Sequence, residues 1–71
     1  MAEHVNAEMS ANVWKILVVP GEAVESEQTL MILESMKMEI PVLSEEAGTV
    51  SAVHVAEGEN VSAGQLLVEI E

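Results

Sequence analysis

Short apolar runs separated by polar, turn-forming residues recur along the whole chain. Runs of β-branched and aliphatic residues predict strands, and the glycine and proline residues between them predict turns. The strands expected on this basis lie near residues 4–9, 13–19, 23–25, 29–35, 38–43, 49–55, 60–62 and 66–71. Short strands at this regular spacing favour an all-β sandwich or flattened barrel.

The pattern also repeats within the chain. Shifted by 37 residues without gaps, segment 10–34 matches segment 47–71 with eight identities. The identical pairs are Val13/Val50, Val18/Val55, Gly21/Gly58, Glu22/Glu59, Val24/Val61, Gln28/Gln65, Leu30/Leu67 and Glu34/Glu71. Each half reads as strand, turn, short strand, turn, strand, which predicts two copies related by a quasi-twofold axis. Val50, Val53 and Val55 do not alternate strictly, which predicts a β-bulge in that strand and in its mate.

Glycines mark the equivalent turns of the two halves. Gly21 and Gly58 each follow an apolar strand and precede a polar pair, where a turn that needs positive φ selects glycine. Pro20 before Gly21 also fits a turn. The halves differ further on, because Glu27 stands where the second half has Gly64. We therefore expect the turn at Glu27 to be distorted or slightly destabilised.

The segment 29–40 has a helical alternative. It is rich in helix-forming residues, and its apolar positions have helix-like spacing, at Leu30, Leu33, Met36 and Ile40. Two observations favour strand-turn-strand instead. The matching segment 67–71 is too short for a stable helix, and Pro41 stops any helix before it.

A hairpin in this segment places its two-residue turn at Met36 and Lys37. Such a turn needs positive φ at both positions, for which Asn-Gly is the usual solution. Non-glycine residues there cost about 1 kcal/mol each. Strain of this kind often marks a site where the side chains serve a function.

Length and charge narrow the possible functions. The 71 residues, about half of them apolar, predict one domain over 1–71, and Trp14 is its only aromatic residue. The chain has 13 glutamates, two lysines and no arginine, for a net charge of −11, which argues against nucleic-acid and anionic-lipid partners. It has no cysteine and no apolar run long enough to span a membrane. Residues 1–4 lack the features of a signal peptide, so we expect a cytoplasmic protein.

One of the two lysines occupies the predicted hairpin tip, in the stretch Glu34-Ser35-Met36-Lys37-Met38-Glu39. Methionines flank Lys37 directly, and carboxylates stand outside them. An amine is nucleophilic only when deprotonated, and lysine is protonated at neutral pH. Lys37 is therefore better suited to being modified by another enzyme than to acting as a catalyst. Flexible, polarisable methionines at a protruding tip suit adaptable recognition.

This stretch, within a twofold repeat, resembles the biotinyl domain, the biotin carboxyl carrier module of biotin-dependent carboxylases. The resemblance covers about residues 7–71 and is closest to small stand-alone biotin/lipoyl attachment proteins. Two departures stand out. The A-P-M-P-G opening usual in the family is replaced by residues 7–11, Ala-Glu-Met-Ser-Ala, and Ser35 stands where many members have alanine or valine. No protruding thumb insertion is present.

The resemblance implies a flattened barrel (a barrel-sandwich hybrid) of two four-stranded sheets, with the attachment lysine at an exposed hairpin. It implies that a biotin protein ligase attaches biotin covalently to Lys37, with Met36 and Met38 as flanking recognition residues. Glu34, Ser35 and Glu39 are further candidates for ligase recognition. The implied role is a non-catalytic, monomeric carrier that moves carboxybiotin between a biotin carboxylase and a carboxyltransferase.

Two alternatives stay open. The first is a lipoyl carrier on the same fold, although that family usually places an acid directly before its lysine, where this chain has Met36. The second is an unmodified acidic adaptor with a central helix. No catalytic motif is present, and His4 and His54 lack metal-ligand spacing, so we expect neither a catalytic nor a metal site.

Overall fold

The computed structural model describes residues 2–71 as an all-β unit; Met1, the first residue of the predicted domain, lies outside them. Its eight strands are β1 (Glu3–Asn6), β2 (Ala11–Ile16), β3 (Ala23–Val24), β4 (Thr29–Ser35), β5 (Met38–Leu43), β6 (Gly48–Val53), β7 (Asn60–Val61) and β8 (Leu66–Ile70). The helix considered for residues 29–40 is therefore absent, and strand-turn-strand is confirmed. Nowhere in residues 2–71 is there a helix of the length and apolarity that a membrane crossing requires.

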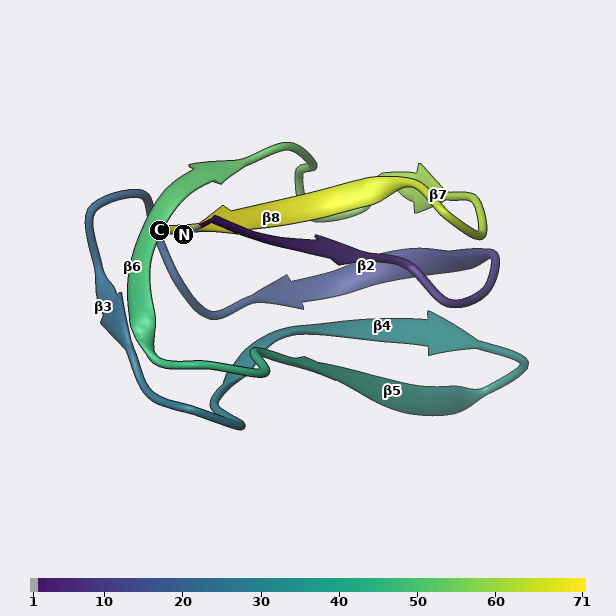
Figure 1. Cartoon of the computed structure of the whole chain (residues 1–71). Coiled ribbons are helices and arrows are strands. Elements are labelled where there is room, and N and C mark those ends of the chain that lie inside the picture. Colours follow the sequence, from purple (N-terminus) through teal and green to yellow (C-terminus); the bar gives the residue numbers. More distant parts are fainter. Residues whose placement is uncertain (1) are drawn as a thin grey trace.

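The strands form two antiparallel four-stranded sheets. One sheet has the order β1-β8-β6-β3 and the other the order β5-β4-β2-β7 (Figure 1). Shifting the first order by one repeat gives the second, because β1, β8, β6 and β3 correspond to β5, β4, β2 and β7. The predicted quasi-twofold relation is thus confirmed. The molecule is elongated, at 32 × 17 × 17 Å.

Each sheet contains strands from both halves of the chain, and matching hydrogen bonds join them. The Gly21 amide donates to the Val50 carbonyl at 2.7 Å, and the Gly58 amide donates to the Val13 carbonyl at the same distance. Both glycines have positive φ, 94° and 89°, as their turns were expected to require. The halves are therefore intertwined, because each sheet is built from strands of both halves.

The core lies between the sheets and is built largely from repeat mates. Its members include the pairs Val13/Val50, Val18/Val55, Val24/Val61, Leu30/Leu67, Met31/Val68 and Leu33/Ile70, all buried. It contains no aromatic side chain, and its aliphatic side chains fill the thin space between two sheets. Because the same positions are buried in both halves, the repeat in the sequence is a repeat of core contacts.

Three strands end two or three residues earlier than predicted. The strand expected at 4–9 ends at Asn6, because Ala7 leaves the sheet edge and exchanges backbone hydrogen bonds with the turn at Gly64 and Gln65. Those expected at 13–19 and 49–55 end at residues 16 and 53. Beyond residues 16 and 53 the chain crosses to the other sheet with Val18 and Val55 still buried, so the apolar pattern continues past the end of the strand pairing. The predicted bulges are present, between Val13 and Lys15 in β2 and between Val50 and Ala52 in β6.

The expected distortion of the turn at Glu27 is wrong. Glu27 has φ of 63° and its mate Gly64 has φ of 87°, so both adopt the left-handed conformation. The Glu27 amide donates to the Ser44 carbonyl at 2.8 Å, as the Gly64 amide donates to the Ala7 carbonyl at 2.7 Å. The surrounding hydrogen bonds hold Glu27 in the left-handed conformation that usually requires glycine. The turn therefore keeps the same shape as the turn at Gly64, and Glu27 bears backbone strain.

Candidate functional site

Lys37 lies at the far end of the hairpin formed by β4 and β5. Ser35 and Met38 form the last cross-strand pair, and Met36 and Lys37 are the two turn residues between them. The hairpin projects at one end of the molecule, away from the chain termini (Figure 1). Both Met36 and Lys37 are exposed, so the amine is presented to the solvent and to large partners.

The turn has the strained geometry predicted for it. Met36 has φ of 52° and Lys37 has φ of 65°, as a type I′ turn requires. Apart from Glu27, these are the only non-glycine residues with positive φ among residues 2–71. The tight turn fixes the position of the lysine at the crest of a two-stranded ribbon. A longer, flexible loop would leave its position variable.

The residues around Lys37 divide between the two sides of this ribbon. Glu34 and Glu39 pair directly across the strands, so their carboxylates project from one side, and both are exposed. Met38, paired with the half-buried Ser35, projects from the other side. Met36 is 91% exposed and Met38 is 65% exposed, so neither belongs to the core. The structure thus brings together all six residues singled out from the sequence.

The Lys37 amine has no ion-pair partner among residues 2–71. Within residues 2–71, the only histidine or lysine side chains in contact with a carboxylate are His4 and His54, which both contact Glu69 on the other sheet. The glutamates of the hairpin contribute negative potential around the amine without forming a salt bridge to it. An exposed, unpaired amine at a rigid tip has room for an acyl substituent, so the site fits covalent attachment through an amide bond.

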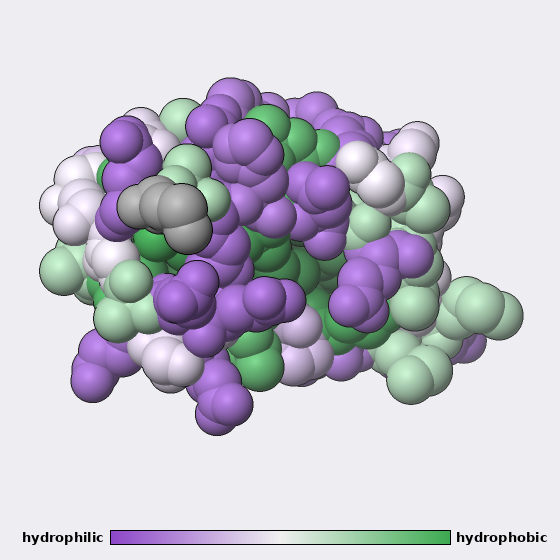
Figure 2. All heavy atoms as spheres, in the orientation of Figure 1, coloured by the Kyte–Doolittle hydropathy of each residue, from purple (hydrophilic) through white to green (hydrophobic). Residues whose placement is uncertain are grey.

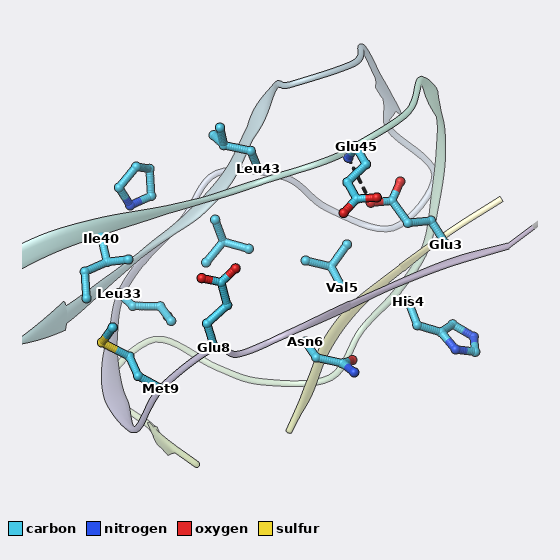
Figure 3. Close-up of a pocket in the computed structure, with 12 residues that line it drawn as sticks. Glu3, His4, Val5, Asn6, Glu8, Met9, Leu33, Ile40, Leu43 and Glu45 are labelled. Atoms are coloured by element: carbon cyan, nitrogen blue, oxygen red, sulfur yellow. Dashed lines mark hydrogen bonds between the residues drawn. The ribbon is translucent and has the colours of Figure 1, made fainter. Parts of the chain in front are cut away.

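A groove runs along the open side of the barrel, between the edge strands β1 and β5. It has a volume of about 350 Å³, with an apolar floor that includes Val5, Leu33 and Val42. Glutamates, among them Glu3 and Glu8, stand around it, and Figure 2 shows the apolar floor between hydrophilic flanks. Figure 3 shows the carboxylate of Glu3 accepting a hydrogen bond from the backbone N–H of Glu45. Lys37 does not line this groove.

Two features were not predicted from the sequence. The groove arises where two sheet edges meet, which depends on strand order. The second feature is the contact of His4 and His54 with the Glu69 carboxylate, at 3.5 and 2.7 Å. These three residues lie on three different strands or loops, and no local spacing signals their meeting. In the described part of the chain, no group of three or more histidine or acidic side chains is placed to hold a metal ion.

Comparison with known proteins places this geometry in a family. Residues 3–70 match the family described as "Biotin-requiring enzyme". The chain is 47% identical over 70 residues to the biotinylated protein TB7.3 homolog of Mycobacterium leprae, covering 99% of both chains. It is 42% identical over 66 residues to the biotin/lipoyl attachment protein of Bacillus subtilis, covering 93% of this chain and 90% of that protein.

A solved structure shows the same fold. The urea carboxylase of Kluyveromyces lactis superposes with a TM-score of 0.93 at 31% identity, over 100% of this chain and 6% of that one. The family match spans nearly every described residue, and the relatives align over almost their full length. The chain therefore belongs to the biotin/lipoyl attachment family of biotin-requiring enzymes.

Proposed function

We propose that this chain is a biotin carboxyl carrier domain that is biotinylated on Lys37. The observation that supports this most directly is the position of Lys37 at the strained crest of the β4–β5 turn, exposed, unpaired and flanked by two exposed methionines. Membership of the biotin/lipoyl attachment family and likeness to proteins named as biotinylated support the same role.

Attachment joins the Lys37 Nζ to the carboxyl carbon of biotin as an amide, with loss of water from the two groups overall. A biotin protein ligase supplies the activation, using ATP, and this chain supplies the amine at a fixed place. The reaction removes one positive charge, so the net charge falls from −11 to about −12. The ligase has to strip water and a proton from the amine, which the absence of a salt bridge at Lys37 makes easier.

The residues beside Lys37 have separate roles in this proposal. Met36 and Met38 provide apolar contacts on both flanks of the lysine, and their unbranched side chains adapt to the surface that receives them. Ser35 is small enough to let the ligase approach the turn. Glu34 and Glu39 form an acidic pair on one side of the ribbon, which selects for a ligase with a basic rim at its active site.

The chain itself acts as a carrier and supplies no catalytic group. Lys37 would hold the biotin, which would supply the group that carries carboxylate from a biotin carboxylase to a carboxyltransferase. The rigid ribbon and the long flexible arm that begins at Lys37 raise the concentration of the cofactor at each partner's active site. The net charge keeps copies of the carrier apart, which suits a cytoplasmic monomer.

Intact-mass measurement tests the attachment. The purified chain is incubated with a biotin protein ligase, ATP and biotin, and we expect one added biotinyl group and a positive streptavidin blot. Lys37→Arg should abolish labelling and leave the fold intact, because this side chain lies in solvent. Lys15→Arg is the matched control, since Lys15 is the only other lysine, and it should label fully. Labelling of the Lys37→Arg chain, or a lipoyl group on the chain isolated from its host, would contradict the proposal.

A further inference from the structure

The quasi-twofold symmetry gives the molecule two equivalent outer faces, and their chemistry differs. Cross-strand pairs place Lys15, Ile32 and Pro41 in one row across β2, β4 and β5. The corresponding row on the other sheet joins β6, β8 and β1 through the repeat mates Ala52, Glu69 and His4. Side chains of directly paired residues project from the same side of a sheet. The two rows therefore occupy equivalent positions on opposite outer faces.

On the face centred on Glu69, the polar side chains contact one another. The Glu69 carboxylate contacts His54 at 2.7 Å and His4 at 3.5 Å, one histidine at each oxygen. The Ser51 hydroxyl donates to the Glu69 backbone carbonyl at 3.1 Å. These polar groups already have partners within the chain, and the face offers no large apolar side chain.

The equivalent face of the other sheet is apolar. We call it the Trp14 face, and its members are Trp14, Lys15, Leu17, Ile32, Pro41 and Leu43, whose repeat mates are Ser51, Ala52, His54, Glu69, His4 and Asn6. Trp14 is 43% exposed, Leu17 49% and Leu43 43%. Trp14 sits at the bulge of β2, and the Lys15 nitrogen lies 5.9 Å from the centre of its ring. An exposed tryptophan among exposed aliphatic residues is the composition of an interface centre.

The charge of this face is also unlike that of the molecule. The chain has 13 glutamates, yet none of the six residues of the Trp14 face is acidic. Lys15 is the only lysine in the sequence besides Lys37, and there is no arginine. Biotinylation neutralises Lys37, which leaves Lys15 as the one lysine with a positive charge. The complementary surface is therefore an apolar depression with a carboxylate opposite Lys15.

The Trp14 face is continuous with the attachment tip. Both belong to the sheet β5-β4-β2-β7, and the row Ile32–Pro41 lies two residues along each strand from the pair Glu34–Glu39. A protein that takes Lys37 into its active site from this side of the ribbon meets the Trp14 face next. The face on the other sheet lacks this direct path to the tip.

We infer that the Trp14 face docks the biotinylated carrier on biotin carboxylase; this inference rests on the proposed function. Carboxylation of the attached biotin is the step common to carriers of this kind, whereas the enzyme that removes the carboxyl group differs with the acceptor. A second copy of this chain is a poor occupant. A twofold contact across this face would bring two Lys15 side chains together, along with two molecules of charge −11.

Carrier-dependent ATP hydrolysis tests the inference, with biotinylated full-length chain as substrate for the biotin carboxylase of the same organism. Trp14→Ser and Ile32→Glu introduce the residues that the fold already holds at the mate positions, Ser51 and Glu69. Lys15→Glu is a third single variant. Each of the three should raise the KM for the carrier about tenfold and leave kcat unchanged, which is a typical loss for a central interface residue. His54→Ala, on the opposite face, is the matched control and should stay within about twofold.

A direct measurement accompanies the kinetics. Trp14 is the only tryptophan, so the ¹⁵N-labelled carrier gives a single indole signal, which should shift or broaden when unlabelled biotin carboxylase is added. Unchanged KM for Trp14→Ser and Lys15→Glu, an equal rise for His54→Ala, or a shift caused only by a second carrier copy or by the carboxyltransferase would overturn the inference. Ligase labelling of each variant reports separately on the proposed function, because it requires Lys37 and a folded hairpin.

Discussion

The two halves of the chain build the same backbone with different residues, and the differences separate what the fold requires from what it tolerates. Gly21 and Gly58, at one turn, are glycine in both halves. At the next turn, Gly64 in the second half is matched by Glu27 in the first, with the same sign of φ and the same hydrogen bond. Elsewhere Gly48 is matched by Ala11, and the buried Ser44 by the buried Ala7.

The hairpin tip lies between the halves and follows another logic. Its two strained residues are Met36 and Lys37, although glycine or asparagine would suit their φ values better. At Glu27 the strain has no evident use, whereas at the tip the strained residues are the proposed attachment lysine and its neighbour. Glu27 is exposed as well, so positive φ in an exposed, bulky residue does not by itself indicate function, and the position at the hairpin tip is what distinguishes Met36 and Lys37.

The largest expected effect is at Gly48. A Cβ atom there would lie 2.5 Å from the Glu71 carbonyl oxygen and 2.7 Å from the Ile70 Cγ2. Gly48→Ala should therefore lower the free energy of unfolding by about 2 kcal/mol or more, as overpacking does in a rigid interior. Urea denaturation measures it. The repeat mate Ala11 already bears a Cβ atom. A Gly48→Ala chain as stable as the wild type would therefore show that both halves accommodate a Cβ atom at this position.

Ser44 should come next. Its buried hydroxyl donates to the Glu25 carbonyl at 2.6 Å, a bond that its mate Ala7 cannot make. Ser44→Ala should lower the free energy of unfolding by about 1 kcal/mol, the usual net value of such a bond. Thermal unfolding followed by circular dichroism tests this. No loss of stability would mean that the second use of the Glu25 carbonyl, by the Gln28 amide at 3.2 Å, suffices.

The strain at Glu27 should be removable. Glu27→Gly, which copies Gly64, should raise the free energy of unfolding by about 0.5 kcal/mol, since relief of the left-handed strain slightly exceeds the entropy of an added glycine. The reverse change, Gly64→Glu, should lower it, although a Cβ at Gly64 meets nothing within 4 Å. Ligase labelling should be unchanged in both. A change in labelling would connect this turn to the site.

The strain at the tip should be removable only at the expense of function. Met36→Asn favours the left-handed conformation and should raise the free energy of unfolding by about 0.5 kcal/mol. Labelling of Lys37 should slow severalfold, because an apolar contact with the ligase is lost. Initial rates of biotin incorporation measure this, with Glu27→Gly as the control for a stabilising change elsewhere. Unchanged labelling would remove Met36 from ligase recognition.

The sequence by itself determined the repeat, the identity of the strands and the geometry of the tip. Matching valines and leucines predict equivalent core positions in the two halves, and glycines predict two of the turns. The tip turn was predictable because ribbon twist demands positive φ at both residues of a two-residue loop. The helical propensity of residues 29–40 lost to strand pairing, as local propensity often does against tertiary contacts.

Apart from the β4–β5 hairpin, only the tertiary structure decided which strands become neighbours. β3 and β7 are two residues long and pair with strands of the opposite half, and nothing in so short a segment specifies a partner. The pairing β1–β8 and β6–β8 brings His4, His54 and Glu69 together, while the equivalent pairing on the other sheet gathers Lys15, Ile32 and Pro41. Sheet register joins residues far apart in the chain through backbone bonds that are alike for every side chain. The two faces therefore emerge only when the whole barrel closes.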